Sequence, residues 1–152
     1  MRTVKNILES KAVKYNSVTP DTLVIDALNL LNTVDMSYLL VMEDEDYKGI
    51  FSERDYSRNV ILKGRASKDT TVQEVMTTDL PIVSLDDTLE HCMNTMITNK
   101  ARYLLVYDEK EKFAGVITIH DLLRQVIASK EDAFDHTTAT QLIDHDEKGR
   151  IY

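Results

Sequence analysis

The sequence contains little of what disulfide-bonded or membrane-spanning proteins need. Its 152 residues include one cysteine, Cys92, so an internal disulfide framework is excluded and a reducing compartment is suitable. No run of about 18 consecutive apolar residues occurs, which excludes a membrane-spanning helix. Residues 1–15 are charged and amphipathic, without the apolar core of a signal peptide. We therefore expect a cytoplasmic protein.

Basic clusters and flexible linkers are also missing. The formal net charge is −8, with 26 acidic residues against 18 lysines and arginines. This balance argues against binding to nucleic acid or to an anionic membrane surface. Only four glycines and two prolines occur, so no long flexible linker is indicated. A chain of this length, with 43% apolar residues, can bury a core of its own, as one domain or two tightly joined halves.

The chain contains an internal repeat. The offset between the copies is 65 residues at first and 66 after one inserted residue. The matching stretches are residues 17–42 with 82–107, residues 49–61 with 115–127, and a short leader, residues 3–8 with 71–76. We predict one repeat with its leader at 1–66, a second repeat at 67–130, and a polar, poorly ordered C-terminal tail at 131–152.

Each repeat has the pattern of a β-α-β-β-α unit. Apolar residues at helical spacing predict a helix after a brief opening strand, with Thr19 and Ser84 as its N-caps in the two copies. The apolar runs at 38–42 and 103–107 predict strands covered on both faces. An acidic turn and a second, hairpin-paired strand follow each run.

A second helix is predicted to begin at Ser52 in one copy and at Thr118 in the other, with Ile61 and Ile127 among its inward-facing residues. The expected fold class is therefore α/β of the α+β type. We expect the two units to be related by a pseudo-twofold axis and packed sheet to sheet.

Three motifs resemble those of a tandem pair of cystathionine-β-synthase (CBS) domains. They are the leader at residues 72–77 and the two G-x-x-[ST]-x-x-D endings, GIFSERD at 49–55 and GVITIHD at 115–121. The resemblance covers residues 3–128, and residues 52–65 are similar to those of short bacterial proteins made only of this pair. It implies a non-catalytic regulatory module that senses energy or redox state. It also implies two clefts for adenosine-containing ligands, such as AMP, ADP, ATP, NAD or S-adenosylmethionine.

The resemblance implies that each cleft draws on both repeats. One would combine Asn16, Ser17, Ser37 and Tyr38 with Thr118, His120 and Asp121. The other would combine Pro81, Ile82, Arg102 and Tyr103 with Ser52, Arg54 and Asp55. In these roles a helix N-terminus and its hydroxyl meet phosphate, the carboxylate meets ribose hydroxyls, and arginine offers forked donors. Because the second cleft has Arg54 and Arg102 where the first has His120 and Ser37, we expect the second to bind charged ligands more strongly.

The same residues have a structural alternative. An S-x-x-D sequence before an apolar helix is also a capping box, in which the hydroxyl and the carboxylate satisfy backbone amides. Arg102 can equally be a solvated surface residue, and Arg58 and Arg124 can be surface ion pairs.

No catalytic or metal-binding residue is predicted, and no catalytic cofactor. H-E-x-x-H, C-x-x-C, G-x-G-x-x-G and P-loop motifs are all missing. His91 and Cys92 are adjacent on a helix and cannot share a metal. A cluster in the tail, made of His136, Asp144, His145 and Asp146, could capture a metal but is typical of chance in a polar segment.

Two rival functions stay open. One is a ligand-free dimerisation or protein-interaction module, and the other, less favoured, is a nucleotide-processing enzyme. We expect a homodimer, because the second helices carry more apolar residues than one inward stripe needs. The candidate dimer residues are Tyr56, Val60, Leu122, Leu123 and Val126. The sequence does not identify the effector protein.

Overall fold

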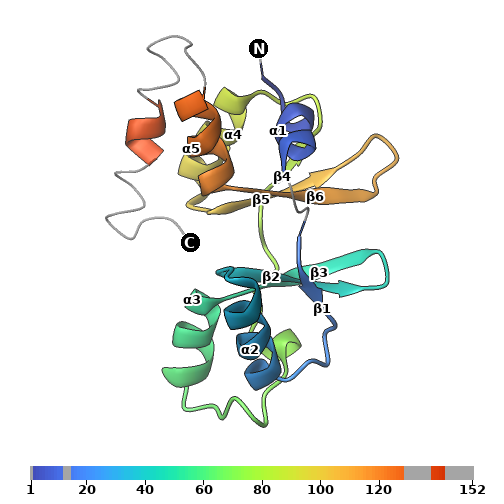
Figure 1. Ribbon diagram of the computed structural model, residues 1–152, viewed down its shortest axis with the longest axis vertical. Helices are drawn as coiled ribbons and strands as arrows, with labels where there is room; N and C mark the ends of the chain where they lie inside the picture. The colour runs from blue at the N-terminus through green and yellow to red at the C-terminus, as the bar shows by residue number, and fades with distance from the viewer. Residues whose placement is uncertain (1, 12–14, 129–137, 143–152) are drawn as a thin grey trace. The chain divides into compact units, whose positions relative to one another are not determined.

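The computed structural model describes residues 2–11, 15–128 and 138–142, and the chain divides into two compact units (Figure 1). Residues 15–79 form one of them, called here the continuous unit. The other, called here the split unit, combines residues 1–14 with residues 80–152. Each contains one three-stranded sheet whose helices cover a single face (Figure 1). The expected α+β class is confirmed, while the sheet-to-sheet packing stays a prediction.

The continuous unit has the predicted order of elements. These are β1 (Ser17–Val18), α2 (Val24–Val34), β2 (Tyr38–Glu43), β3 (Asp46–Ser52), α3 (Glu53–Asp55), the π-helical η1 (Tyr56–Ile61) and the 3-10 helix η2 (Val72–Glu74). β2 is the central strand, parallel to β1 and antiparallel to β3. α2 turns its apolar residues to the sheet and ends at Asp35, which adopts the left-handed conformation with φ 53°.

The split unit repeats this arrangement. Its elements are α1 (Val4–Ser10), β4 (Ile82–Ser84), α4 (Leu89–Asn99), β5 (Tyr103–Tyr107), β6 (Phe113–Thr118) and α5 (Ile119–Ala128). Tyr103 begins the central strand as Tyr38 does in the other unit. Asp121 and Asp55 are both the third residue of the helix that follows the hairpin. The two predicted copies therefore correspond element by element.

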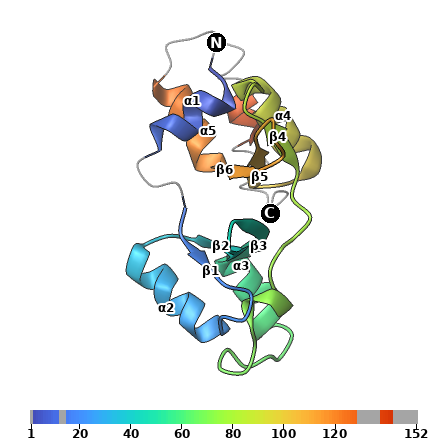
Figure 2. The ribbon, with the colours of Figure 1, turned by 90° about the vertical axis from the view of Figure 1, so that its right-hand side faces the viewer.

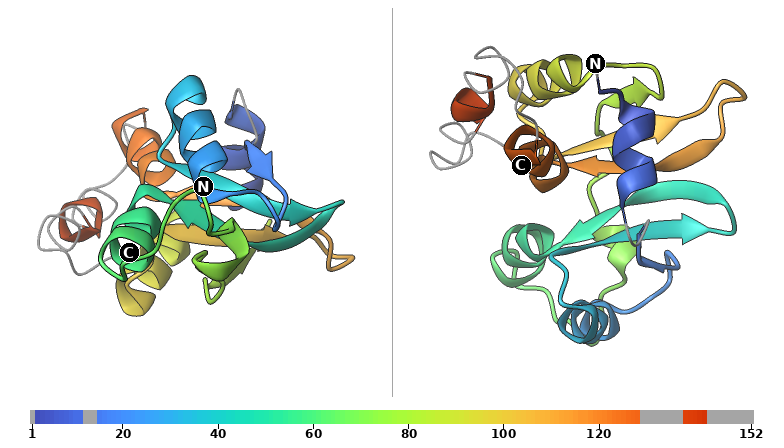
Figure 3. Two further views of the ribbon diagram at one scale, coloured as in Figure 1. Left: turned by 90° about the horizontal axis from the view of Figure 1, so that it is seen from below. Right: turned by 45° about the horizontal axis from the view of Figure 1, so that its top comes forward.

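Each leader packs on the other repeat. Helix α1, from the leader of the first repeat, lies beside α5 and β6 of the second (Figures 2 and 3). The leader containing η2 pairs with the first repeat instead, through backbone bridges from Thr71 to Leu23 and from Thr77 to Ile50. The compact units therefore differ from the repeats read along the chain, and the limits 1–66 and 67–130 stay a prediction as domain boundaries.

Two glycines allow this close approach of the leaders. A Cβ at Gly49 would lie 2.6 Å from Sδ of Met76 and 2.9 Å from the carbonyl oxygen of Thr77. A Cβ at Gly115, where φ is +154°, would lie 3.2 Å from a methyl carbon of Leu8. Met76 and Leu8 are equivalent leader residues, so the first glycine of each G-x-x-[ST]-x-x-D ending makes room for a leader.

The prediction that Thr19 and Ser84 are N-caps is wrong. Helix α2 begins at Val24 and α4 begins at Leu89, so the N-caps are Leu23 and Thr88, each four residues after the predicted position. The preceding backbone pairs with the leaders: the Val24 N–H donates to Thr70 O at 2.8 Å, and the Leu89 N–H donates to Arg2 O at 3.2 Å. Because these segments form bridges, the helices begin only after them.

The helix that follows each hairpin buries one residue of an apolar pair and exposes the next. Val60 and Val126 are buried, whereas Ile61 is 53% exposed and Ile127 is 83% exposed. The prediction that both isoleucines face inward is therefore wrong, since neighbours on a helix diverge by about 100°. Leu122 is buried as well, so three of the five candidate dimer residues, Val60, Leu122 and Val126, do not lie on the surface.

Part of the predicted polar tail belongs to the core of the split unit. Residues 138–142 are helical, and Ala139 and Leu142 pack in the same apolar cluster as α1, α4 and α5. Thr138 is buried beside them. The prediction of a wholly polar tail missed this segment because two apolar residues three positions apart are a weak signal.

Candidate ligand site at two equivalent helix starts

In the continuous unit, the predicted site residues gather where β2 begins and β3 ends. Tyr38 pairs with Ser52 across the two strands. The Glu53 N–H donates to Ser37 O at 3.2 Å, and the Leu40 N–H donates to Asn16 O at 2.9 Å. These bonds bring the backbone of the segments before β1 and β2 next to the start of α3. The residues concerned are Asn16, Ser17, Ser37, Tyr38, Ser52, Arg54 and Asp55.

The split unit gathers the corresponding residues in the same way. Tyr103 pairs with Thr118, the Ile119 N–H donates to Arg102 O at 3.0 Å, and the Leu105 N–H donates to Pro81 O at 2.9 Å. Ile82 is 62% exposed on β4, an apolar side chain suited to contact a purine. The residues concerned are Pro81, Ile82, Arg102, Tyr103, Thr118, His120 and Asp121. Each unit therefore holds one half of each predicted cleft, and the combination of the halves stays a prediction.

Ser52 and Asp55 form a capping box at the start of α3. The carboxylate Oδ2 accepts from the Ser52 N–H at 2.8 Å and from its hydroxyl at 2.9 Å, and the Asp55 N–H donates to Ser52 Oγ at 3.3 Å. The Thr77 hydroxyl donates to the other oxygen, Oδ1, at 2.7 Å. Burial raises the pKa of Asp55 above its ordinary value, although these hydrogen bonds and the charge of Arg58 oppose the shift.

Thr118 and Asp121 form the same box at the start of α5, with different partners. The Thr118 N–H donates to Asp121 Oδ2 at 2.9 Å, and the Asp121 N–H donates to Thr118 Oγ1 at 3.2 Å. Two cations complete the group: Lys11 Nζ donates to Oδ2 at 2.9 Å, and Arg124 Nη2 donates to Oδ1 at 2.7 Å. Burial alone would raise the pKa of Asp121. The charge of Lys11 and the hydrogen bonds from Thr118, Lys11 and Arg124 together outweigh burial and lower that pKa.

The capping alternative is therefore confirmed in both copies. Each box uses Oδ2 of the carboxylate for the backbone N–H at the helix start. Oδ1 lies outside each box and accepts from Thr77 in one copy and from Arg124 in the other. Since a carboxylate oxygen has two lone pairs, capping does not exclude a further contact. The ligand-binding role of these residues stays a prediction.

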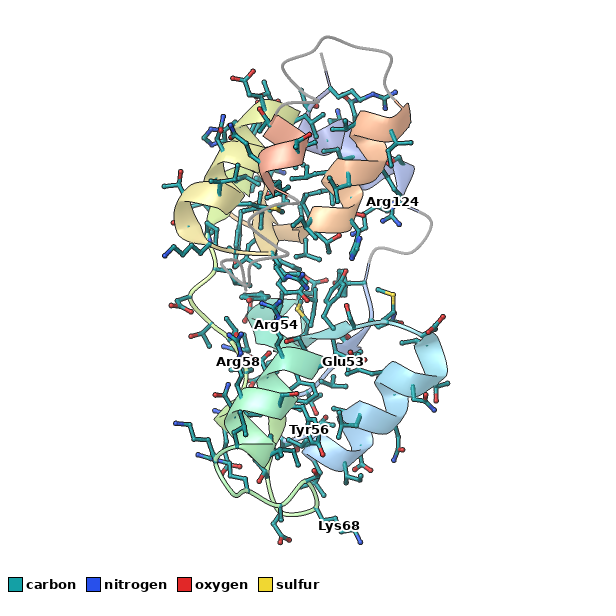
Figure 4. All side chains as sticks on the ribbon, turned by 90° about the vertical axis from the view of Figure 1, so that its left-hand side faces the viewer. Glu53, Arg54, Tyr56, Arg58, Lys68 and Arg124 are labelled. Atoms are coloured by element: carbon teal, nitrogen blue, oxygen red, sulfur yellow. The ribbon has the colours of Figure 1, made fainter. Side chains whose placement is uncertain are left out.

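The arginines have different surroundings. Arg54 is half-buried at the start of α3, and Arg58 is exposed one turn later (Figure 4). Arg102 is half-buried, so it is not the fully solvated residue of the alternative interpretation. Arg124 is 69% exposed and pairs with the buried Asp121. His120 and Ser37, which occupy the positions of Arg54 and Arg102 in the other copy, are exposed.

Sequence reasoning missed Lys11 and the role of Thr77. Thr77 stands at the end of the second leader, where its backbone bridge to Ile50 brings the hydroxyl to Asp55. Lys11 lies three residues beyond the matched leader stretch, and no repeated residue marks it.

Within the described part of the chain, no group of three or more His, Cys, Asp or Glu side chains is placed to hold a metal. The tail cluster containing His136 and His145 lies outside the described residues. Burial, with a smaller contribution from Asp87, raises the pKa of the Cys92 thiol to about 12, so this residue is a neutral core side chain at pH 7. No helix in the described ranges combines the length and apolarity needed to cross a membrane.

The CBS domain family model matches this chain twice, at residues 4–61 and 72–128. The chain therefore belongs to the CBS domain family, whose stand-alone members are generally regulatory. Among curated proteins, it is 27% identical over 146 residues to the mitochondrial CBS domain-containing protein CBSX3 of Arabidopsis thaliana. This match covers 90% of the chain and 70% of that protein.

Solved structures give the same result. A CBS-domain protein of Burkholderia ambifaria is 36% identical, with a TM-score of 0.76, and the match covers 87% of this chain and 98% of that one. The structure of CBSX2 in complex with AMP is 25% identical, with a TM-score of 0.66, covering 86% of this chain and 100% of that one. The resemblance drawn from the leader and the two motif endings is thus confirmed.

Proposed function

We propose that this protein is a regulatory module that binds an adenosine-containing ligand, AMP, ADP, ATP or NAD, at the starts of α3 and α5. The observation that carries the proposal is the buried carboxylate at each start, in a unit whose neighbouring segments hold exposed or half-buried residues: Asn16, Ser17 and Ser37 in one unit, and Pro81, Ile82 and Arg102 in the other. The AMP complex of CBSX2, a structure 25% identical to this chain, supports the choice of ligand class.

Each residue has a role in this proposal. Asp55 and Asp121 accept hydrogen bonds from the two hydroxyls of a ribose. The helix starts, with the hydroxyls of Ser52 and Thr118, face the phosphates. Arg54 adds a forked cation at the start of α3. Ile82 and the neighbouring strand residues contact the purine.

A ligand series on the unaltered protein tests the ribose contact. Titration calorimetry would compare AMP with 2′,3′-dideoxy-AMP, which lacks the hydroxyls that the carboxylates recognise. We expect a loss of about tenfold to a hundredfold, since a hydrogen bond to a charged group contributes roughly 1.5–3 kcal/mol. Equal affinity for the two compounds would contradict the assignment of Asp55 and Asp121 to ribose.

Arg54→Ala tests the phosphate contact. We expect it to weaken ATP more than adenosine, while Arg65→Ala, on an exposed arginine of the same unit, leaves both unchanged. If the unaltered protein binds no adenine nucleotide at millimolar concentration, the function proposed here is wrong and the interaction module replaces it. Release of a product from incubated ATP, followed by chromatography, would instead favour the nucleotide-processing enzyme.

Assembly and location are also proposals. The apolar residues that are exposed on the second helices or directly after them, Ile61, Leu62 and Ile127, favour a homodimer. Light scattering that shows only a 17.4 kDa species at micromolar concentration would contradict it. We retain the cytoplasm as the proposed compartment, although the similar plant protein CBSX3 is mitochondrial.

A further inference from the structure

Lys11 in the split unit makes the contacts that Thr77 makes in the continuous unit, with a strand carbonyl and with the capping carboxylate. The side chain of Lys11 is 12% exposed, and its ammonium donates to Asp121 Oδ2 at 2.9 Å and to Val116 O at 3.1 Å. In the other unit, the Thr77 N–H donates to Ile50 O at 2.8 Å and its hydroxyl donates to Asp55 at 2.7 Å. Val116 and Ile50 are equivalent positions of the repeat, so one ammonium replaces two neutral donors.

This replacement changes the charge of the helix start. The hydrogen bonds that Asp55 accepts from Ser52 and Thr77 come from neutral groups. Asp121 is paired with two cations, Lys11 and Arg124. One carboxylate and two cations give that group a formal charge of +1. Arg58, the equivalent of Arg124, also acts on Asp55, so the cation that the split unit adds is Lys11. The side chain of Lys11 is only 12% exposed, so salt screens its charge weakly.

We propose that Lys11 makes the Thr118–Asp121 helix start selective for adenosine ligands that carry several phosphates. The inference rests on the proposed function, because the ribose must be at Asp121 for its 5′-phosphates to lie near Lys11. At moderate salt the ammonium acts on phosphates that lie within a Debye length of it, about 10 Å. Lys11 therefore gives the start of α5 a cation of its own, which the expectation of a stronger phosphate site at α3, with Arg54, left out of account.

The experiment compares ligands that differ only in phosphate number. Titration calorimetry would measure adenosine, AMP, ADP and ATP with the full chain in an Arg54→Ala background, which weakens phosphate binding at α3. Adding Lys11→Gln should weaken ATP about tenfold and adenosine by less than about twofold, as expected for loss of a charged partner. Lys11→Arg, which keeps the charge, should restore the preference for ATP.

Two control variants separate charge at the site from other effects. Lys5→Gln removes an exposed lysine of the same helix α1, and we expect it to leave all four affinities within about twofold. Thr77→Val removes the neutral equivalent of Lys11 in the continuous unit. We expect it to leave the ratio of ATP to adenosine affinity unchanged.

The possible results are distinct. An unchanged ATP-to-adenosine ratio in Lys11→Gln overturns the inference. Equal weakening of all four ligands overturns it as well, since Lys11 would then only hold the leader in place, and melting of the unliganded variant would reveal that role. An unaltered protein that binds none of the four compounds overturns the proposed function itself, and this inference with it.

Discussion

The two units place the same carboxylate in opposite electrostatic surroundings. Asp55 and Asp121 occupy equivalent positions and form equivalent capping boxes, yet burial raises the pKa of the first while cations lower that of the second. The difference originates at the ends of the leaders, because Thr77 follows one leader and Lys11 lies three residues beyond the other. A repeated motif thus preserves backbone geometry, while a separate segment of the chain sets its charge.

The largest expected effect follows from removing the charge of Asp121. Asp121→Asn would leave the nearly buried Lys11 without its anion, and we expect the free energy of unfolding to fall by about 3 kcal/mol. Arg124 contributes little to this loss because it is 69% exposed and can be solvated. Urea denaturation at pH 7 measures the change.

Asp55→Asn is the matched control. An asparagine there can accept from Ser52 through its carbonyl and donate to the Thr77 hydroxyl, so we expect a loss below about 1 kcal/mol. Equal losses in the two variants would show that the cations are not what distinguishes the units.

The next largest effect concerns the leader that packs on the continuous unit. Gly49→Ala would bring a methyl group against Met76 and the backbone of Thr77, and we expect a loss of about 2 kcal/mol. Because shortening Met76 removes part of the overlap, the double variant with Met76→Ala should lose less than the sum of the single losses. Strict additivity would contradict a direct contact between the two residues.

Removing either capping box should have a smaller effect on stability, and the two effects should be nearly equal. Ser52→Ala and Thr118→Ala each remove the oxygen that accepts from the N3 amide, and we expect each to lower the free energy of unfolding by about 1 kcal/mol. Thr118→Ser keeps the cap and should lose much less. Thermal melting without ligand measures these values, and a loss confined to one unit would break the equivalence of the boxes.

The smallest effect is a difference in pH dependence. Since the pKa of Asp121 is lowered in the folded state, its contribution to stability is present above the ordinary value of 3.8 and is lost as the pH falls through the folded pKa. The contribution of Asp55 to stability changes with pH in the opposite direction. It is present below pH 3.8 and is lost as the pH rises through the raised pKa of Asp55.

Urea midpoints of the unaltered protein and the two asparagine variants, from about pH 3 to pH 7, test these signs. The deficit of Asp121→Asn should shrink toward acid pH. The stability of Asp55→Asn relative to that of the unaltered protein should increase as the pH rises, by less than about 1 kcal/mol. Parallel pH profiles for the two variants would contradict the opposite shifts.

Local features of the sequence predicted the fold well. The helix starts at Ser52 and Thr118 were predicted correctly because a capping box is formed by residues three positions apart. The N-caps at Thr19 and Ser84 were wrong because pairing with distant leaders decides where those helices begin. Periodicity also could not decide which of two adjacent apolar residues, such as Val126 and Ile127, faces the core.

The candidate site was predictable only in part, for a related reason. The repeat marks its carboxylates and hydroxyls, which lie in matching positions. Lys11 reaches Asp121 across 110 positions of the chain, and neither spacing nor repetition connects the two residues. The charge at the start of α5 therefore emerges only when the chain is folded.

The exchange of leaders makes the continuous unit an insertion within the split unit. Residues 15–79 contain all of their own elements, so this unit can fold as soon as they have been synthesised. Helix α1 is synthesised before the insertion but has to wait for β6 and α5, which lie beyond it. A folded insertion shortens the loop that α1 must close to reach them, and closing a shorter loop costs less entropy. Folding of the split unit should accordingly follow that of the continuous unit, and the Lys11–Asp121 ion pair should be among the last contacts to form.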